Sequence, residues 1–473
     1  MALFTLRLSI ISSCLLLLTP LAQAQQQNQL AKPQTVADAP PLSLQDAIRL
    51  GLEHNYNIRL SQADQEIARN NVTRGNAGQL PIVDASFTRT YNLNYSRQQT
   101  GENAPSVVRG GHSNALIGNA GVTWTIFDGF GMFIAYDRLR ALEQSQQHLT
   151  RATVEETVEN ISNAYYDVVR QSGKIKSLEE ALVIGQQRID LTQAQVDVGV
   201  SAKVEVLTAR VDFNADRSLL IQQQELLSTA KINLNNLLGR TATNDFSPAD
   251  SIVVERTLNQ ETILQDIAAR NPRLQQARVG VQIANYDRRL IRANRFPQLD
   301  LNGNYGINRN INNNAIVITR TNNTITTSVT TNTNRVYGPN YGFTIGLPVF
   351  NGFNNRRLEQ NARVLEAQSQ LVLEQTNLNL GTEAAQAFAQ YQNRLQLLQL
   401  EEDNITLARQ NVAIALERYR LGLLTPLVLR EAQLSQIAAA TRLLDIRFQA
   451  KQAELALRRL SGNLVQESVT QRP

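Results

Sequence analysis

Apolar residues recur at every seventh position along two long stretches of the sequence. One series comprises Val154, Ile161, Val168, Ile175, Leu182, Ile189 and Val196, and the other comprises Ala384, Tyr391, Leu398, Ile405, Val412 and Tyr419. A strict seven-residue period over this many turns indicates helices that pack side by side with a left-handed supercoil. The pattern predicts long helices over 128–198 and 352–421, each followed by a return helix, over 201–238 and 425–461.

A glycine stands at each point where a long helix gives way to its return helix. Gly199 and Gly422 suit the left-handed conformation that often ends a helix. Ser201 is the expected N-cap of the first return helix, and Thr425 followed by Pro426 is the expected start of the second. These caps lie 224 positions apart whereas the glycines lie 223 apart, so we expect the two turns to differ by one residue.

Four shorter segments, over 82–95, 114–127, 298–308 and 336–350, alternate apolar and polar residues. Alternation of this length suits a membrane barrel with an apolar lipid-facing band, but a soluble antiparallel sheet alternates in the same way. The run 308–335 is almost wholly Asn, Thr and β-branched residues, and we expect a long polar loop there. External loops of this kind favour the barrel.

These segments belong to two tandem copies of one unit. The turn Phe127, Asp128, Gly129 and Phe130 returns 223 positions later as Phe350, Asn351, Gly352 and Phe353, whereas upstream Pro81 and Pro297 lie 216 positions apart. The copies cover 42–239 and 259–463, with linkers over 25–41 and 240–258 and a tail over 464–473. A short helix is predicted near the start of each copy, over Leu44–Leu52 and Glu261–Arg270.

The first 24 residues have the pattern of a secretory signal peptide. Arg7 precedes an apolar run that ends at Leu18, and Pro20 and the small-x-small sequence ending at Ala24 follow. Cleavage after Ala24 is the prediction, and lipidation at Cys14 is the alternative. Because Cys14 is the only cysteine, the cleaved chain would have no disulfide, thiol or thiolate-metal chemistry.

Charge and hydropathy narrow the partners and the route into a membrane. The net charge of +5 is spread along the chain without a basic run, which argues against a nucleic-acid partner. No segment after the signal peptide has eighteen consecutive apolar residues, so any passage through a membrane would use strands. Four strands are too few to close a barrel, since the smallest have about eight. An open sheet edge is not tolerated in hydrocarbon, so such a chain must assemble with two, three or four copies.

The sequence resembles the TolC-type outer-membrane efflux proteins along nearly the whole of its mature length. The resemblance rests on AIRLGLEHNYNIRLSQ, on the paired turns IFDGF and VFNGF, and on ERYRLGLLTPLVLREAQ from Glu417 to Gln433, all in duplicated order. It implies a mixed α and β membrane protein in the outer membrane of a Gram-negative bacterium, built as a homotrimer. Twelve strands would form one barrel in the outer membrane, and twelve helices would form a hollow α-barrel across the periplasm. It also implies two partners, an inner-membrane transporter and a periplasmic adaptor that docks at the helix tips.

The resemblance places a gate where the helices converge, near Gly199 and Gly422. Acidic positions that narrow the lumen in the family correspond to Glu205 and Glu431, whereas Val428 replaces a third carboxylate, so strong cation selectivity does not carry over. The alternative for Glu205 and Glu431 is that they are ordinary carboxylates on a solvent-facing side of a helix, without a role in the gate. Tyr419 corresponds to an aromatic residue of the family's gate contacts, but it also lies on the heptad stripe, where core packing explains it.

Apolar residues flank both glycine turns, where an isolated hairpin would expose them. The candidate docking tips comprise Val198, Gly199, Val200, Leu421, Gly422, Leu423 and Leu424. Exposed apolar tips indicate a docking surface, and we expect the adaptor to bind there. The resemblance assigns the two Phe-x-Gly-Phe turns to the points where a membrane strand bends into a periplasmic helix.

Catalysis finds no support in the sequence. His54, His112 and His148 are expected at a helix end, in a polar loop and on a long helix, without the spacing of a metal site or a triad. Gly101, Gly110 and Gly111 are expected in a polar hairpin loop rather than in a phosphate-binding one. The interpretation is an export channel for small molecules or secreted protein that needs no cofactor. The alternative from another class is a periplasmic coiled-coil protein without a pore.

Overall fold

A computed structural model describes residues 40–99, 106–321 and 324–465. The chain divides into two units, Met1–Pro40 and Pro41–Pro473, and the second carries all the described elements. The predicted signal peptide, Cys14, Gly101 and most of the predicted tail lie outside the described residues.

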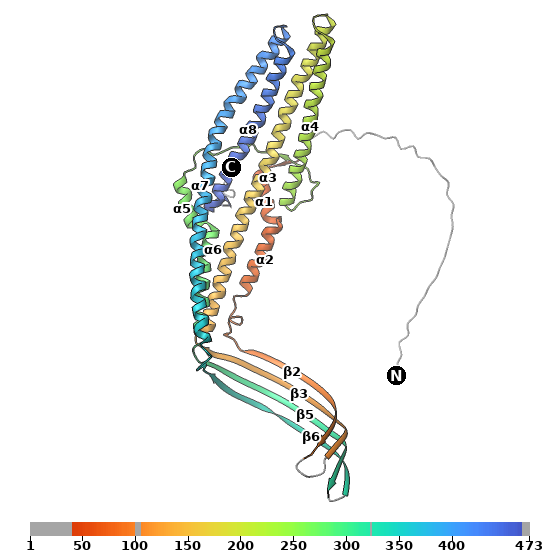
Figure 1. Cartoon of the computed structure of the whole chain (residues 1–473), viewed down its shortest axis with the longest axis vertical. Coiled ribbons are helices and arrows are strands. Elements are labelled where there is room, and N and C mark those ends of the chain that lie inside the picture. The colour runs from red at the N-terminus through yellow and green to blue at the C-terminus, as the bar shows by residue number, and fades with distance from the viewer. Residues whose placement is uncertain (1–39, 100–105, 322–323, 466–473) are drawn as a thin grey trace, which may run out of the picture. The chain divides into compact units, whose positions relative to one another are not determined.

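Two pairs of long antiparallel helices confirm the heptad prediction. The first pair is α3 (Gly131–Asp197) and α4 (Lys203–Leu237), and the second is α7 (Asn354–Arg420) and α8 (Pro426–Ser461). Figure 1 shows each pair as a hairpin that ends at a tight turn. The heptad stripe is fully buried at Ile161 and Val168 and nearly so at Leu398, which shows that it faces the neighbouring helices.

Both long helices begin later than expected, at Gly131 instead of 128 and at Asn354 instead of 352. The reason is local. Phe130 and Phe353 have positive φ, 67° and 61°, in the left-handed region that an α-helix excludes. The glycine that precedes each phenylalanine is also left-handed, so two residues of each turn belong to the bend.

Shorter helices precede each hairpin in both copies. They are α1 (Leu44–His54) and α2 (Tyr56–Asn70) in the first copy, and α5 (Gln260–Arg270) and α6 (Pro272–Ala293) in the second. Asn55 and Asn271 cap α2 and α6 with their side-chain oxygens. Their amide nitrogens donate to Leu237 O at 2.7 Å and to Leu460 O at 2.9 Å, so each asparagine also fixes the end of a return helix.

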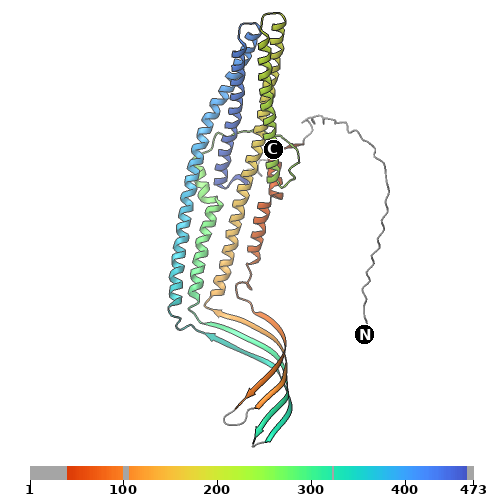
Figure 2. The same cartoon turned by 45° about the vertical axis from the view of Figure 1, so that its right-hand side comes forward.

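The helices pack as a layer in which α6 lies between α3 and α7, as Figure 2 shows. A hydrophobic core forms where α1 and the short parallel strands β1 (Pro41–Leu42) and β4 (Ser247–Pro248) cover α3. Tyr165 lies in this core, and its hydroxyl donates to Leu42 O at 2.9 Å. A second core around Tyr391 packs α5 against α7 and α8.

The remaining strands form one antiparallel sheet of order β2-β3-β5-β6. Its strands are β2 (Ile82–Gln98), β3 (Ser106–Asp128), β5 (Gln298–Thr321) and β6 (Thr324–Gly346). In the register Trp124 lies opposite Leu301, which lies opposite Phe343, so the apolar residues of successive strands share one face. That face is uncovered within the described chain: Phe87 is 73% exposed and Tyr341 is 84% exposed.

The predicted loop over 308–335 is wrong. Asn308–Thr321 continue β5 and pair with the first half of β6, from Thr324 onward. Thr, Val and Ile favour extended backbone, and cross-strand pairing satisfies the backbone of the asparagines between them. The polar composition of this segment therefore did not indicate that it forms strands. At its other end β6 stops at Gly346, four residues before the predicted end at 350.

The loop expected around His112 is also wrong, because His112 lies within β3, opposite Leu93 of β2. Gly110 and Gly111 belong to the same strand. Within the described ranges, none of the helices carries the long uncharged apolar run that a membrane-spanning helix requires.

Candidate functional site at the tips of the helical hairpins

Each hairpin turns on a left-handed glycine. Gly199 has φ 80° and Gly422 has φ 71°. Val200 N–H donates back to Gln195 O, and Leu423 N–H to Arg418 O, both at 2.9 Å, so the two turns satisfy equivalent helix carbonyls. A Cβ built on either glycine meets no atom within 4 Å, so backbone conformation rather than crowding favours glycine there.

The two turns have the same length. The N-cap of α4 is Ala202 rather than the expected Ser201, whereas Thr425 caps α8 and Pro426 begins it as predicted. Ala202 and Thr425 are 223 positions apart, like the glycines, so the expected difference of one residue is wrong. Neither cap makes a side-chain hydrogen bond, and the extended backbone of the capping residue alone starts each helix.

Apolar side chains project from both turns. Val198, Val200, Leu421 and Leu423 are each at least 70% exposed. Leu424 is different because it is half-buried and packs against the cluster that includes Leu429. Leu424 is therefore not part of the exposed apolar surface that was expected at the tips.

Tyr419 links the two hairpins just below the turns. Its ring is 2% exposed and packs with Ala415 and Leu429, while its hydroxyl lies 2.7 Å from Thr192 Oγ1 on α3. Thr192 donates its only hydroxyl hydrogen to Arg188 O at 2.7 Å. The tyrosine must therefore donate to the threonine. The two predicted roles of Tyr419, gate contact and heptad packing, are thus compatible in one side chain.

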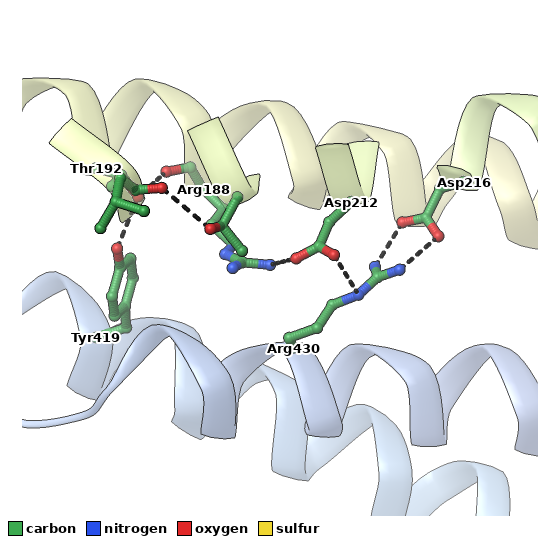
Figure 3. Close-up of polar contacts among 8 residues, drawn as sticks. Arg188, Thr192, Asp212, Asp216, Tyr419 and Arg430 are labelled. Atoms are coloured by element: carbon green, nitrogen blue, oxygen red, sulfur yellow. Dashed lines mark hydrogen bonds and ion pairs between the residues drawn. The ribbon is translucent and has the colours of Figure 1, made fainter. Parts of the chain in front are cut away.

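An alternating row of charges crosses the same interface, as Figure 3 shows. Arg188 of α3 donates to Asp212 of α4 at 2.8 Å. Arg430 of α8 donates two hydrogen bonds to Asp216, at 2.6 and 2.9 Å, and its Nε lies 3.8 Å from Asp212. One arginine of the second hairpin is therefore held by two aspartates of the first.

The row is buried at two of its members, partly exposed at Arg430 and Asp212, and electrically balanced. Arg188 and Asp216 are each 3% exposed, and the two arginines match the two aspartates in charge. The hydrogen bonds to Asp216 raise the pKa of Arg430 above its usual value, against the opposing effect of burial. The guanidinium therefore stays charged, and separating the hairpins would break its hydrogen bonds to Asp216.

The acidic gate candidates do not take part in this row. Glu205 is half-buried in the first turn of α4, while Glu431 is exposed on α8 and Val428 is 44% exposed. Glu205 donates its backbone N–H to Ala202 O, but neither its carboxylate nor that of Glu431 makes a hydrogen bond or an ion pair with the described part of the chain. The structure of one chain does not bring these three residues together.

The sequence prediction missed Arg188, Thr192, Asp212, Asp216 and Arg430. One signal was present in the heptad pattern. Asp216 follows Val206, Ala209 and Phe213 on the inward stripe of α4, where a charged residue is unusual. Its partner, however, lies 214 residues away on another helix, and heptad spacing contains no information about that pairing.

The strand-to-helix turns are alike in their aromatic contacts and different in their surroundings. Phe127 and Phe130 meet edge to face at a ring distance of 5.3 Å, and Phe350 and Phe353 do the same. Gly129 is tightly packed, because an added Cβ would lie 2.6 Å from Ala293 O. An added Cβ at Gly352 meets nothing within 4 Å.

The model of the outer membrane efflux protein family matches this sequence over residues 47–240 and 263–463. The chain belongs to the outer membrane efflux protein family. It is 23% identical over 428 residues to the probable efflux pump outer membrane protein TtgC of Pseudomonas putida, covering 89% of this chain and 83% of that protein. It is 24% identical over 267 residues to the outer membrane protein TolC of Escherichia coli, covering 54% of this chain and 49% of that one.

Solved structures show the same fold. The outer membrane channel CmeC of Campylobacter jejuni superposes with a TM-score of 0.70 at 16% identity, covering 90% of this chain and 89% of that one. The outer membrane protein VceC of Vibrio cholerae gives a TM-score of 0.68 at 18% identity, covering 89% and 96%.

Family membership places this efflux protein in the outer membrane and makes it a passive channel component, not an enzyme. It also rules out the alternative of a periplasmic coiled coil without a pore. The three histidines lie far apart in the fold, with His54 ending α1, His112 in β3 and His148 on α3.

Proposed function

We propose that three copies of this chain form one continuous duct, the exit channel of an export system that also contains a periplasmic adaptor and an inner-membrane transporter. The observation that carries the proposal is the four-stranded sheet. The outer edge of β2 and the outer edge of β6 pair with no strand of the described chain. Unpaired backbone groups cannot remain in hydrocarbon, so other copies must complete the sheet.

Three copies give twelve strands, which exceeds the minimum for a closed barrel. The apolar face of the sheet, with Phe87, Tyr341 and Phe343, is then the surface that contacts lipid. In the same assembly the helical layer of each copy supplies one third of a hollow cylinder in the periplasm.

The row of charges below the hairpin tips is the proposed closing contact of the duct. It joins α8 of the second hairpin to α4 of the first through Arg430 and Asp216. Moving the hairpins apart would break the two charge-assisted hydrogen bonds between Arg430 and Asp216. Opening therefore needs a partner that compensates this loss, and the adaptor at the tips is the proposed source.

Small apolar and amphipathic compounds are the proposed cargo, as opposed to secreted protein. This choice rests on relatives that match 89% of the chain, whose names describe efflux pumps for toluene and for antibiotics. The channel itself would contribute geometry and gating, and selection among compounds would belong to the transporter.

The proposal is tested by deleting the gene and restoring it on a plasmid. Loss of dye and antibiotic resistance on deletion, with recovery on complementation, is the expected result. An unchanged resistance profile together with loss of a secreted protein would instead assign the duct to protein secretion.

The docking tips are tested in the same strain with Val200→Asp and Leu423→Asp. These changes place charges in the apolar tips, and we expect them to abolish export while the protein remains trimeric in the outer membrane. Val200→Ile and Leu423→Met keep the tips apolar and should preserve export. Full export by the aspartate variants would exclude the tips as the docking surface.

A further inference from the structure

A pocket of about 470 Å³ lies where the first strand-to-helix turn meets the end of α6. The start of α3 and the last turn of α6 form its walls, and Gly129 lies at its edge. Three phenylalanines line it, Phe130, Phe133 and Phe296, each more than half exposed. The pocket is outside the gate and the docking tips, and the proposed export path does not use it.

The aromatic side of the pocket continues the apolar face of the sheet. Phe127 lies opposite Leu299, which lies opposite Ile345 on that face. The ring centroids of Phe127 and Phe130 are 5.3 Å apart, and those of Phe130 and Phe133 are 6.4 Å apart. A molecule lying along the lipid-facing side of the sheet would therefore reach the pocket without crossing a polar surface.

Two arginines form the polar side of the pocket. Arg289 and Arg292 are one turn apart on α6, are both exposed, and have no ion-pair partner in the described part of the chain. Other arginines of this region are paired: Arg288 with Glu366 at 2.7 Å, and Arg295 with Glu359. Arg289 also lies over the ring of Tyr286, 5.6 Å from its centroid, which leaves its N–H donors at the edge of the guanidinium. Two guanidinium groups without a carboxylate partner in one pocket suit a phosphate group.

One acidic side chain, Asp137, shares the pocket. A carboxylate in the same pocket as two guanidinium groups opposes the binding of a simple anion. It suits a ligand that carries a negative group and a positive group. The phosphoethanolamine headgroup has this pattern, with a phosphate diester and a primary ammonium group joined by two carbons. The acyl chains of such a lipid would extend over the phenylalanines.

We propose that this pocket binds the headgroup of phosphatidylethanolamine in the periplasmic leaflet of the outer membrane. Arg289 and Arg292 bind the phosphate, Asp137 accepts a hydrogen bond from the ammonium group, and Phe130 and Phe133 contact the acyl chains. Bound lipid would fix the height of the strand-to-helix turn at the membrane surface. The inference requires the outer-membrane location of the protein and is independent of its cargo.

The second strand-to-helix turn provides a matched control. Arg356 and Arg357 follow Phe353 and are exposed, so they lie at a comparable turn with similar charge. The surroundings differ, because an added Cβ at Gly352 meets no atom of the described chain within 4 Å, whereas one at Gly129 lies 2.6 Å from Ala293 O. Lipid attraction by charge alone would depend on both arginine pairs equally.

The test is native mass spectrometry of the detergent-purified oligomer, delipidated and then titrated with phosphatidylethanolamine. Arg289→Gln with Arg292→Gln should weaken binding about tenfold or more, because one charge-assisted hydrogen bond is worth roughly a decade of affinity. Arg356→Gln with Arg357→Gln should bind as the wild type does. Equal binding by both double variants, or equal loss in both, would overturn the site.

Asp137→Asn tests the choice of headgroup. It should keep lipid binding but lose the preference for phosphatidylethanolamine over phosphatidylglycerol, measured in competition. An unchanged preference would overturn the role of the ammonium group. The mass of the oligomer in each spectrum reports assembly, and export assays of the same variants separate this proposal from the proposed function.

Discussion

Arg430 is the residue on which the contact between the two hairpins depends most. It contributes three of the contacts in the row of charges, and its side chain is largely buried beside Asp216. A bidentate arginine–aspartate pair fixes orientation as well as distance, which lysine cannot reproduce. The hairpins are therefore held in one relative register, and not merely attracted to each other.

Replacing Arg430 with Gln should loosen the closed tips. The change leaves Asp216 as a buried carboxylate without its cation, a loss of about 3–5 kcal/mol for that contact. We expect larger and more frequent openings in planar bilayers and greater sensitivity of cells to bulky antibiotics.

Arg430→Gln combined with Asp216→Asn provides the comparison for this prediction. The double variant has no orphan charge, so its conductance should be nearer to that of the wild type than the single variant's is. If Arg430→Gln conducts as the wild type does, the row of charges does not hold the channel closed.

The stability of the folded chain should depend on pH through Glu155, which lies on α3 far from the tips. It is 2% exposed on α3, and burial raises its pKa to about 7 from 4.5, against the opposing effects of Arg151 and the N–H groups of Leu464 and Val465. Between these two pKa values the folded chain binds a proton that the unfolded chain has lost. Stability should therefore fall as the pH rises from about 4.5 to about 7, by on the order of 3 kcal/mol at most.

Glu155→Gln mimics the protonated side chain at every pH. We expect it to raise the melting temperature at pH 8, where Glu155 of the wild type is ionised, and to change it little at pH 4.5. Differential scanning fluorimetry of the purified protein at both pH values measures this. A shift of the same size at pH 4.5 would show that burial of the charge is not the cause.

At the scale of elements, the sequence predicts what is periodic and misses what depends on distant contacts. The heptad stripes identify the long helices, because burial against a neighbour imposes the period. The composition of 308–335 misleads, because asparagines and threonines that read as a loop are satisfied by strand pairing. The pairing of Arg430 with Asp216 could not be predicted, since nothing local records which helix lies opposite.

The two strand-to-helix turns allow a controlled test of backbone strain against packing. Gly129→Ala and Gly352→Ala both place a Cβ on a left-handed residue, which costs about 1–2 kcal/mol. At Gly129 the new Cβ also lies 2.6 Å from Ala293 O and 2.7 Å from Phe296 Cβ, so α6 must shift. Nothing crowds Gly352.

Gly129→Ala should therefore lower the thermal stability and the amount of assembled protein in outer membranes more than Gly352→Ala does. Immunoblots of membrane fractions and melting curves measure both effects. Equal effects would mean that conformational strain alone restricts these positions.

At the scale of the whole molecule, the internal repeat predicts how neighbouring copies meet. Within one chain, β3 of the first copy of the repeat pairs with β5 of the second, and Val122 lies opposite Gly303. The position equivalent to Val122 in the second copy is Ile345, 223 residues later, and the position equivalent to Gly303 in the first copy is Phe87, 216 residues earlier. If contacts between chains repeat the contact within the chain, Ile345 of β6 lies opposite Phe87 of the neighbouring β2.

Phe87→Cys with Ile345→Cys should therefore cross-link neighbouring chains. Both positions are on the apolar face of the sheet, and directly opposite antiparallel residues have Cβ atoms about 4.5–5.5 Å apart, close enough for a disulfide after small adjustments. Phe87→Cys with Thr344→Cys is the matched control, because adjacent residues of a strand point to opposite faces. Cys14 is the only cysteine of the sequence, so cleavage of the predicted signal peptide would leave no competing thiol. Oxidised membranes should give a closed trimer on a non-reducing gel only with the first pair. A dimer limit, or equal linking by the control, would contradict the trimeric closure or the register derived from the repeat.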